Sequence, residues 1–198
     1  MKKYIKLLFI LAGAVWLGGL FADVRALEED LVRLHVVAAS DSQTDQAVKL
    51  RVRDAVLEAL KMENVRDIGQ AKAYIEARIP ELEAAANAVL ADAGSPDRAV
   101  VTLTREEFPV REYNTFRLPS GVYQSLRVTI GPGEGKNWWC VVYPELCVPA
   151  TSQGFAEAAA MDGMDETLTG ALTGDYEIRF WLLDKIGELR NFLHRDSE

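Results

Sequence analysis

The chain has 198 residues, of which 49% are hydrophobic and 26% charged, a composition typical of a globular protein and too apolar for a disordered one. Thirty acidic residues against 22 basic ones give a net charge of −8, which argues against a nucleic-acid partner because phosphate binding needs clustered Lys and Arg. With two cysteines and two histidines, the chain has few of the residues that usually bind zinc. We therefore expect no metal and no cofactor.

The N-terminus has the order of a secretory signal. Three lysines among the first six residues precede an uncharged run over 7–22, and Asp23 is the first acidic residue. Ala22 and Ala26 are the candidate cleavage positions. The alternative is an uncleaved anchor, since a spanning helix needs about 20 apolar residues with a lower limit near 17. The basic start stays in the cytoplasm, so both alternatives export the rest of the chain.

Cleavage makes the exported part more acidic. Removing residues 1–26 takes away four basic residues and one acidic residue, so the net charge changes from −8 to −11. Such a surface is repelled by anionic lipid headgroups and by nucleic acid. We expect a soluble domain outside the cytoplasmic membrane, with membrane contact only through residues 7–22 if the segment is uncleaved.

One strand and two helices are predicted next. Apolar residues alternate with polar ones over 31–37, which indicates a half-buried strand. A cluster of capping residues at 40–45 begins a helix that continues to about residue 62. A second helical pattern covers 67–92, and Pro80 inside it is expected to kink or divide that helix.

The sequence between residues 99 and 143 predicts closely spaced strands. Periodicity leaves open whether residues 122–125 form one helical turn or part of a strand. The predicted strands cover 99–104, 110–118, 126–130 and 138–143, with a turn at 119–121 and a loop at 131–137. Together these elements predict an α+β fold with a mostly antiparallel sheet and the two helices packed on it.

The C-terminal part begins with a change of composition. Residues 149–174 are rich in Ala, Gly, Thr and Met, which is typical of a linker or surface excursion. An amphipathic helix follows from about 175 to 194, and it either docks on the domain or binds a partner. The predicted organisation is a signal peptide or anchor (1–26), an α+β signalling domain (27–148), the linker (149–174) and the C-terminal helix (175–198).

The two cysteines are Cys140 and Cys147. Export places them where disulfides persist, and a turn at Tyr143-Pro144 would bring the sulfurs together. Such a loop would stabilise the fold by about 2–3 kcal/mol. The alternative is two separate buried thiols, since free cysteine is among the most buried residue types.

No catalytic constellation stands out. The loop over 131–137 fails the Walker A pattern, because Ile130 and Asn137 occupy the positions that require Gly and Ser or Thr. His35 lies on the predicted strand and is interpreted as a polar strand-face residue. The acidic groups, among them Glu28 and Glu106, are interpreted as solvated surface. We predict that the protein is not an enzyme.

The most unusual stretch is Asn137-Trp138-Trp139-Cys140. Adjacent residues of a strand face opposite ways, so one tryptophan can enter the core while the other faces a second layer, solvent or a partner. Tryptophan is also enriched at interface hot spots. The alternative is that both rings pack around the disulfide.

Several blocks resemble the stage II sporulation protein R family in order and spacing. The block with two tryptophans and two cysteines is specific, whereas residues 149–174 lie outside the resemblance. Ala39 and Lys136 depart from the pattern that we expect. The similar blocks are LHVVAASDS (34–42), DQAVKLRVRDAV (45–56), LPSGVYQSLRVTIG (118–131), GEGKNWWCVVYPELC (133–147) and IRFWL (178–182).

The resemblance implies a sporulation signal that is secreted from the forespore into the intermembrane space of an endospore-forming bacterium. There it would activate a membrane-embedded aspartic protease, which then processes the precursor of sigma factor E. The alternative function is an exported cell-envelope hydrolase that uses unidentified carboxylates. The predicted partner-binding residues are Gly133, Glu134, Gly135, Lys136, Asn137, Trp138 and Trp139.

Overall fold

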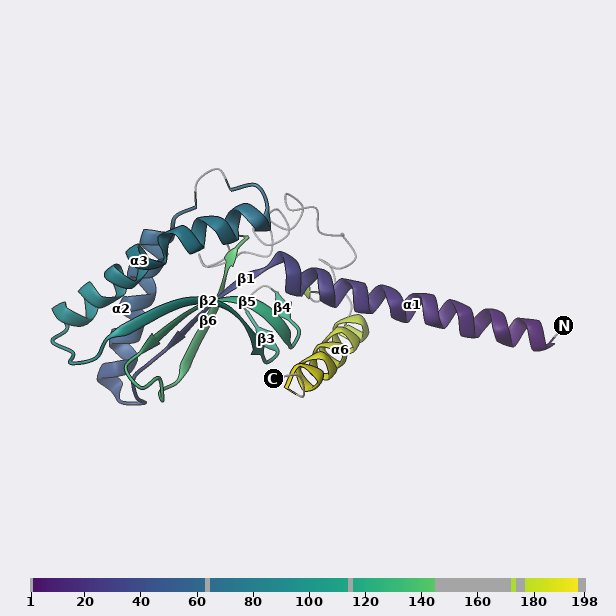
Figure 1. Cartoon of the computed structure of the whole chain (residues 1–198). Coiled ribbons are helices and arrows are strands. Elements are labelled where there is room, and N and C mark those ends of the chain that lie inside the picture. The colour runs from purple at the N-terminus through teal and green to yellow at the C-terminus, as the bar shows by residue number, and fades with distance from the viewer. Residues whose placement is uncertain (1, 63–64, 114–115, 145–171, 174–176, 196–198) are drawn as a thin grey trace. The chain divides into compact units, whose positions relative to one another are not determined.

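The computed structural model describes residues 2–62, 65–113, 116–144, 172–173 and 177–195 (Figure 1). The chain divides into two compact units. The sheet unit comprises Asp30–Glu106 and Tyr123–Ala150. The terminal unit comprises Met1–Glu29, Glu107–Val122 and Thr151–Glu198. The domain boundaries predicted from the sequence stay a prediction.

The sheet has four strands in the order β2-β5-β1-β6. The central pair, β1 and β5, is parallel, whereas β1 and β6 are antiparallel. The Gly131 N–H donates to the carbonyl of Arg98 (2.8 Å), so β5 ends beside the start of β2 and these strands run in opposite directions. The predicted α+β fold with a mostly antiparallel sheet is confirmed. The bounds are β1 Val32–Val37, β2 Ala99–Phe108, β5 Gly121–Ile130 and β6 Asn137–Tyr143.

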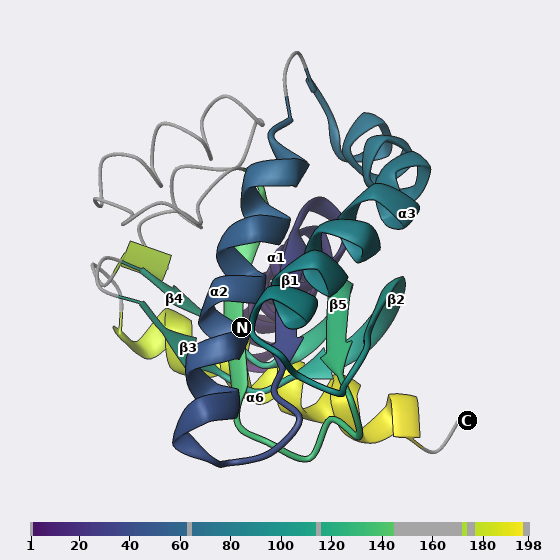
Figure 2. The ribbon, with the colours of Figure 1, turned by 90° about the vertical axis from the view of Figure 1, so that its left-hand side faces the viewer.

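Two long helices cover one face of this sheet (Figure 2). α2 spans Gln43–Leu60 and begins at Ser42, whose side chain accepts the Asp45 N–H. α3 spans Ile68–Asp92 and runs through Pro80 as one helix, so the expected division at this proline is wrong. Proline removes one backbone hydrogen bond, but buried residues on both sides of it hold the helix on the sheet.

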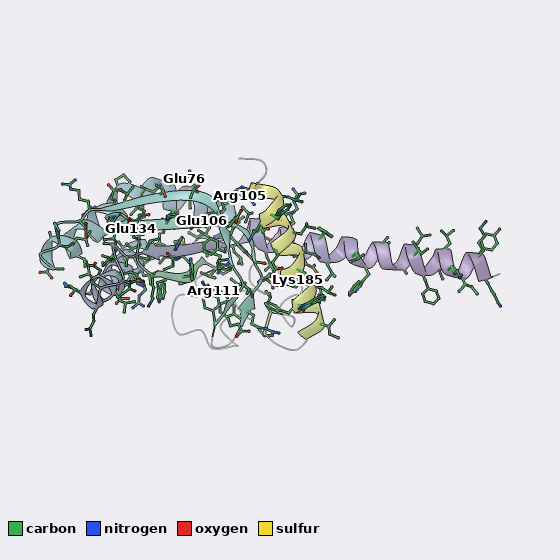
Figure 3. The ribbon with its side chains drawn as sticks, turned by 90° about the horizontal axis from the view of Figure 1, so that it is seen from below. Glu76, Arg105, Glu106, Arg111, Glu134 and Lys185 are labelled. Carbon is green, nitrogen blue, oxygen red and sulfur yellow. The ribbon has the colours of Figure 1, made fainter. Side chains whose placement is uncertain are left out.

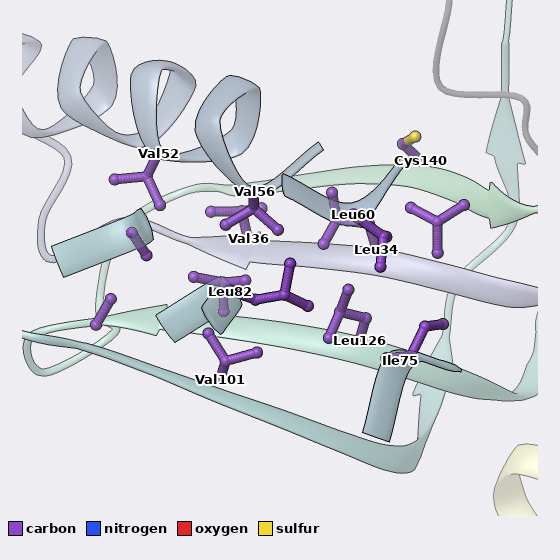
Figure 4. Packing of buried hydrophobic residues seen from close by; sticks show 14 of the residues in the cluster. Leu34, Val36, Val52, Val56, Leu60, Ile75, Leu82, Val101, Leu126 and Cys140 are labelled. Carbon is purple, nitrogen blue, oxygen red and sulfur yellow. The ribbon is translucent and has the colours of Figure 1, made fainter. Parts of the chain in front are cut away.

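The core lies between these helices and the sheet (Figure 4). Each helix contributes residues three, four or seven positions apart, and each strand contributes alternate residues, as the two periodicities require. Burying one Val or Leu side chain stabilises the fold by about 1.5–3 kcal/mol. Core residues include Leu34, Val36, Val52, Val56, Leu60, Ile75, Leu82, Val101 and Leu126.

β1 is buried along all six of its residues, whereas the sequence predicted a half-buried strand. Arg33 is 0% and His35 8% exposed, so the polar face of this strand is withdrawn from water as well. The Arg33 guanidinium lies over the Tyr123 ring, 4.8 Å from its centroid. A central strand in this sheet therefore places its polar side chains among partners from neighbouring strands.

The predicted strand over 110–118 is instead a small hairpin of the terminal unit. β3 (Arg111–Glu112) pairs with β4 (Arg117–Leu118) in an antiparallel register. The Tyr113 N–H donates to the Phe116 carbonyl (2.8 Å), and their rings stack with centroids 4.5 Å apart. Residues 122–125 belong to β5, which settles the alternative of a helical turn in favour of the strand.

α1 (Lys2–Asp30) is the one helix in the described part of the chain that is long and apolar enough to cross a membrane. Most of its length is exposed, but one side of its C-terminal turns is buried. Leu20, Val24 and Leu27 are at most 2% exposed. α6 (Glu177–Arg195) forms the other long helix of the terminal unit. Most of the predicted linker over 149–174 lies outside the described residues.

A buried ion pair joins the two long helices of the terminal unit. Glu28 is 0% exposed, and Arg190 of α6 donates to both of its carboxylate oxygens (2.8 and 3.0 Å). The Val122 N–H donates to the same carboxylate (3.1 Å). The interpretation of Glu28 as solvated surface is therefore wrong, because Arg190 and the Val122 N–H bind its carboxylate away from water.

We expect Arg190→Ala to lower the free energy of unfolding by about 3 kcal/mol, because it leaves the Glu28 carboxylate buried without its cation. Urea unfolding of the full chain in dodecyl maltoside micelles measures this. Lys185→Ala on the same helix is the matched control, since its partner Glu188 is exposed and the pair contributes little. Equal midpoints for the two variants would contradict the prediction.

Candidate functional site

The loop over 131–137, which holds most of the predicted contact residues, is fixed through its backbone. The N–H groups of Glu134 and Gly135 donate to the carbonyls of Ala39 (3.3 Å) and Ala38 (2.9 Å). The Lys136 N–H donates to the Asp41 carboxylate (2.7 Å). The segment that follows β1 therefore serves as the template for this loop.

Glycine is required in this loop by space and by backbone conformation. A Cβ on Gly135 would lie 2.3 Å from the Ser40 carbonyl oxygen, a distance that no side chain tolerates. Gly131 and Gly133 have φ values of 56° and 66°, in the left-handed region that favours glycine. The loop therefore has one tightly defined path across residues 38–41.

The side chain of Lys49 in α2 binds the end of the same loop. Its side chain is buried, and its ammonium donates to the carbonyl of Lys136 (2.9 Å) and to the Gln46 amide oxygen (2.7 Å). Burial lowers the pKa of Lys49, the Asp41 carboxylate opposes this shift, and the positive charges of Arg53 and Lys136 add to it. The buried ammonium of Lys49 thus links the loop to α2 and is not part of the exposed surface.

The two tryptophans lie on opposite faces of β6, as the alternation predicted. Trp138 packs on the helix side against the core, with the Arg53 guanidinium 4.6 Å from its ring centroid. Trp139 pairs in register with His35, and their ring centroids are 5.4 Å apart on the other face. The structure therefore does not bring both rings into one surface patch.

Of the seven predicted contact residues, three present exposed side chains. Glu134, Lys136 and Asn137 are exposed, and Figure 3 shows Glu134 at the end of the sheet unit. Gly133, Gly135, Trp138 and Trp139 are half-buried. Cys140 is buried, but Cys147 lies outside the described residues, so the Cys140–Cys147 disulfide stays a prediction.

A polar cluster that the sequence did not indicate crosses the sheet on the face opposite the helices. Glu106 of β2 is its centre, with a side chain 15% exposed. Its carboxylate accepts the Ser125 hydroxyl, lies 2.9 Å from His35 Nδ1, and is 2.9 Å from the Arg127 guanidinium. Trp139 stacks beside His35, so all four strands contribute to this row.

The environment of Glu106 keeps its carboxylate ionised. Burial alone would raise its pKa, but the hydrogen bonds of His35 and Ser125 and the positive charges of His35 and Arg127 outweigh burial. The net direction is a pKa below the ordinary value. A general acid at neutral pH needs the opposite shift. The ionised carboxylate is therefore suited to cross-link the strands and not to act as a general acid.

The interpretation of Glu106 as solvated surface is wrong. One signal in the sequence points to it, since Thr102, Thr104 and Glu106 share the phase opposite the core residue Val101. In the observed strand order, these alternate residues of β2 lie on the same face of the sheet as the polar residues of β5 and β1. No group of three or more metal-ligating side chains occurs among the described residues.

Comparison with known proteins decides the family. The model of the family described as stage II sporulation protein R matches residues 28–153, more than half of the chain. The chain belongs to this family. The match begins in the last turn of α1 and includes the described part of the sheet unit, with the 131–137 loop and both tryptophans of β6.

A curated relative agrees with this assignment. Stage II sporulation protein R of Bacillus subtilis (strain 168) is 33% identical over 132 residues, which cover 66% of this chain and 59% of the relative. The match thus spans less than two thirds of the relative's length. No solved structure matches the chain. The resemblance noted in the sequence is confirmed as family membership, and the chain is a sporulation protein.

We expect Glu106→Gln to destabilise the chain by about 1–3 kcal/mol at pH 7, because it removes charge-assisted hydrogen bonds from a part-buried site. The folded-state pKa of Glu106 lies below its ordinary value of 4.5, so this contribution is present above that value and is lost as pH falls through the folded-state pKa. Urea unfolding at several pH values measures it.

Glu81→Gln is the matched control for this experiment, since Glu81 is an exposed carboxylate on α3 of the same unit. Its midpoint should follow the unsubstituted chain at every pH. A Glu106→Gln deficit that is the same at pH 7 and at pH 3 would contradict the assigned role of the carboxylate charge.

Proposed function

We propose that this protein is an exported sporulation signal that activates a membrane-embedded aspartic protease across the intermembrane space around the forespore. The activated protease then processes the precursor of sigma factor E. The protein acts as a ligand that binds the active state of the protease preferentially and so shifts its population. It contributes contacts and no catalytic group.

The observation that carries this proposal is membership of the stage II sporulation protein R family together with an apolar N-terminal helix. Such a helix fits a signal peptide or an anchor, and export of the rest of the chain, which either one would bring about, supports the proposal. The acidic composition fits a protein that meets its partner in an aqueous space.

The contact surface that we propose is the stretch from Gly133 to Trp139. A backbone held in one path loses little conformational entropy when it binds, so a fixed loop is a favourable recognition element. The exposed groups of this stretch are a carboxylate, an ammonium and an amide, on Glu134, Lys136 and Asn137. These groups would set the orientation of the partner, with Trp139 at the flank.

The proposal is tested by co-expression of the chain with the candidate protease and the sigma precursor in a non-sporulating host. We expect cleavage of the precursor only when all three proteins are present, because the ligand has no proteolytic activity of its own. Immunoblotting of the precursor and its product measures this. Cleavage by the protease at the same rate without the chain would overturn the proposal.

The surface assignment is tested separately with the double charge reversal Glu134→Lys and Lys136→Glu. Both side chains are exposed and the loop is held by backbone groups, so the variant should fold. We expect precursor cleavage to fall at least about tenfold, which corresponds to about 1.4 kcal/mol of binding.

Glu81→Lys is the matched control, an exposed charge reversal on α3 that should leave cleavage unchanged. The thermal midpoint of each variant is measured in parallel. A folded double variant that supports cleavage as well as the unsubstituted chain would show that the contact surface lies elsewhere, while leaving the proposed function intact.

A further inference from the structure

α6 carries an apolar stripe that its own unit leaves uncovered. The exposed fractions are 78% for Ile178, 58% for Trp181, 47% for Leu189, 61% for Phe192 and 57% for Leu193. Residues at these spacings fall on one side of a helix. An amphipathic helix of a soluble domain normally turns its apolar residues inward, so this stripe calls for a partner of its own.

The opposite side of α6 accounts for how the helix is held. Asp184 accepts the Ser120 N–H (2.9 Å), and Asn191 donates to the Phe108 carbonyl (3.2 Å). Gly187 allows this close approach, since a Cβ there would lie 1.6 Å from the Ser120 carbonyl oxygen. The packing of α6 within its unit is therefore complete without the stripe.

Two ion pairs fix how α6 crosses α1. Arg179 lies 2.7 Å from Asp23, and Arg190 binds Glu28. The two arginines are about 16 Å apart along α6, whereas their partners are only about 7.5 Å apart along α1, at 1.5 Å per residue. The helices therefore cross at a steep angle, as Figure 3 shows, where Lys185 marks the middle of α6.

This crossing directs the stripe toward the apolar half of α1. The packed side of α6 faces Ser120 and its neighbours at the C-terminal end of α1, because the Val122 N–H binds Glu28 there. The uncovered side faces the other way, along α1 toward its N-terminus. That part of α1 exposes its own apolar side chains, with Phe9 73% and Val15 77% exposed.

The C-terminal end of α1 packs within the terminal unit. This packing argues against removal of α1 by cleavage. Leu20 and Val24 are buried, and Asp23 and Glu28 bind α6. Cleavage after Ala22 or after Ala26 would separate buried side chains from the unit that buries them. Retention of α1 as an anchor keeps the terminal unit intact and leaves residues 7–22 to enter a bilayer.

We propose that α1 anchors the chain and that the stripe of α6 lies on the lipid surface beside it. With α1 along the bilayer normal, a steeply crossing α6 lies near the membrane plane at the depth where α1 leaves the hydrocarbon. Tryptophan is enriched at that depth, and an interfacial helix buries its apolar side by about 5–10 Å. Lys185 lies within the stripe, where its long stem lets the ammonium reach the headgroups.

The occupant is lipid, and the test separates it from a second copy of the chain. The full chain is reconstituted in phosphatidylcholine vesicles without bromine, with phosphatidylcholine brominated near the headgroup end of its acyl chains, or with phosphatidylcholine brominated deep in the acyl chains. The emission of Trp181 is obtained as the difference between the chain and its Trp181→Phe variant, a conservative change at an exposed position.

We expect shallow bromines to quench most of the Trp181 emission. Trp16, isolated by Trp16→Phe, should be quenched more strongly by bromines deep in the chains, because it lies within the apolar run. Trp138, isolated by Trp138→Phe, is the negative control, since it packs against α2 beneath Arg53. Circular dichroism of each variant reports whether it is folded.

Two results would overturn the proposal. If bromolipid leaves Trp181 emission unchanged while acrylamide quenches it, the stripe faces water. If neither quencher reaches Trp181, a second copy of the chain covers the stripe. Neither result touches the proposed activation of the protease, which the co-expression experiment tests on its own.

Discussion

A strand that is buried on both faces must satisfy every polar group that it carries, and β1 is such a strand. Its apolar residues meet the helices, and its polar residues Arg33 and His35 meet Tyr123, Trp139 and the Glu106 carboxylate. The two faces of the sheet therefore differ in chemistry: one is a hydrocarbon core, the other a cross-linked polar row.

β1 also fixes the position of the candidate contact loop. The chain that leaves the strand at residues 38–41 supplies the carbonyl and carboxylate groups that bind the backbone of residues 134–136. Because the backbone N–H groups of residues 133–136 are engaged, the loop presents its chemistry through the exposed side chains of Glu134, Lys136 and Asn137. The proposed contact with a partner would gain specificity from such pre-organisation.

In the other direction along the chain, a single residue separates β1 from α1. The last turns of α1 belong to the terminal unit through the buried pair of Glu28 and Arg190. The apolar helix that fits a signal peptide or an anchor thus shares residues 20–29 with the folded terminal unit. This overlap is the physical reason why a cleavage position chosen from small residues alone conflicts with the burial of Leu20 and Val24.

Periodicity predicted the positions of the four strands, the two long helices of the sheet unit and the opposite directions of Trp138 and Trp139, because these depend on local spacing. It left residues 122–125 open and gave β2 and β5 shorter bounds than the structure has. The burial of Glu106 and Glu28 escaped prediction, since the partners that decide it lie 71 and 162 residues away in sequence. The continuity of α3 through Pro80 likewise depends on tertiary burial.

The C-terminal end of α1 is an integral part of the folded terminal unit. The most direct measurement is the intact mass of the chain purified from the membrane fraction of cells that export it. We expect a chain that retains Leu20 and every residue after it, and that stays with the membrane after carbonate washing. A folded, freely soluble chain that begins at residue 23 or at residue 27 would contradict it.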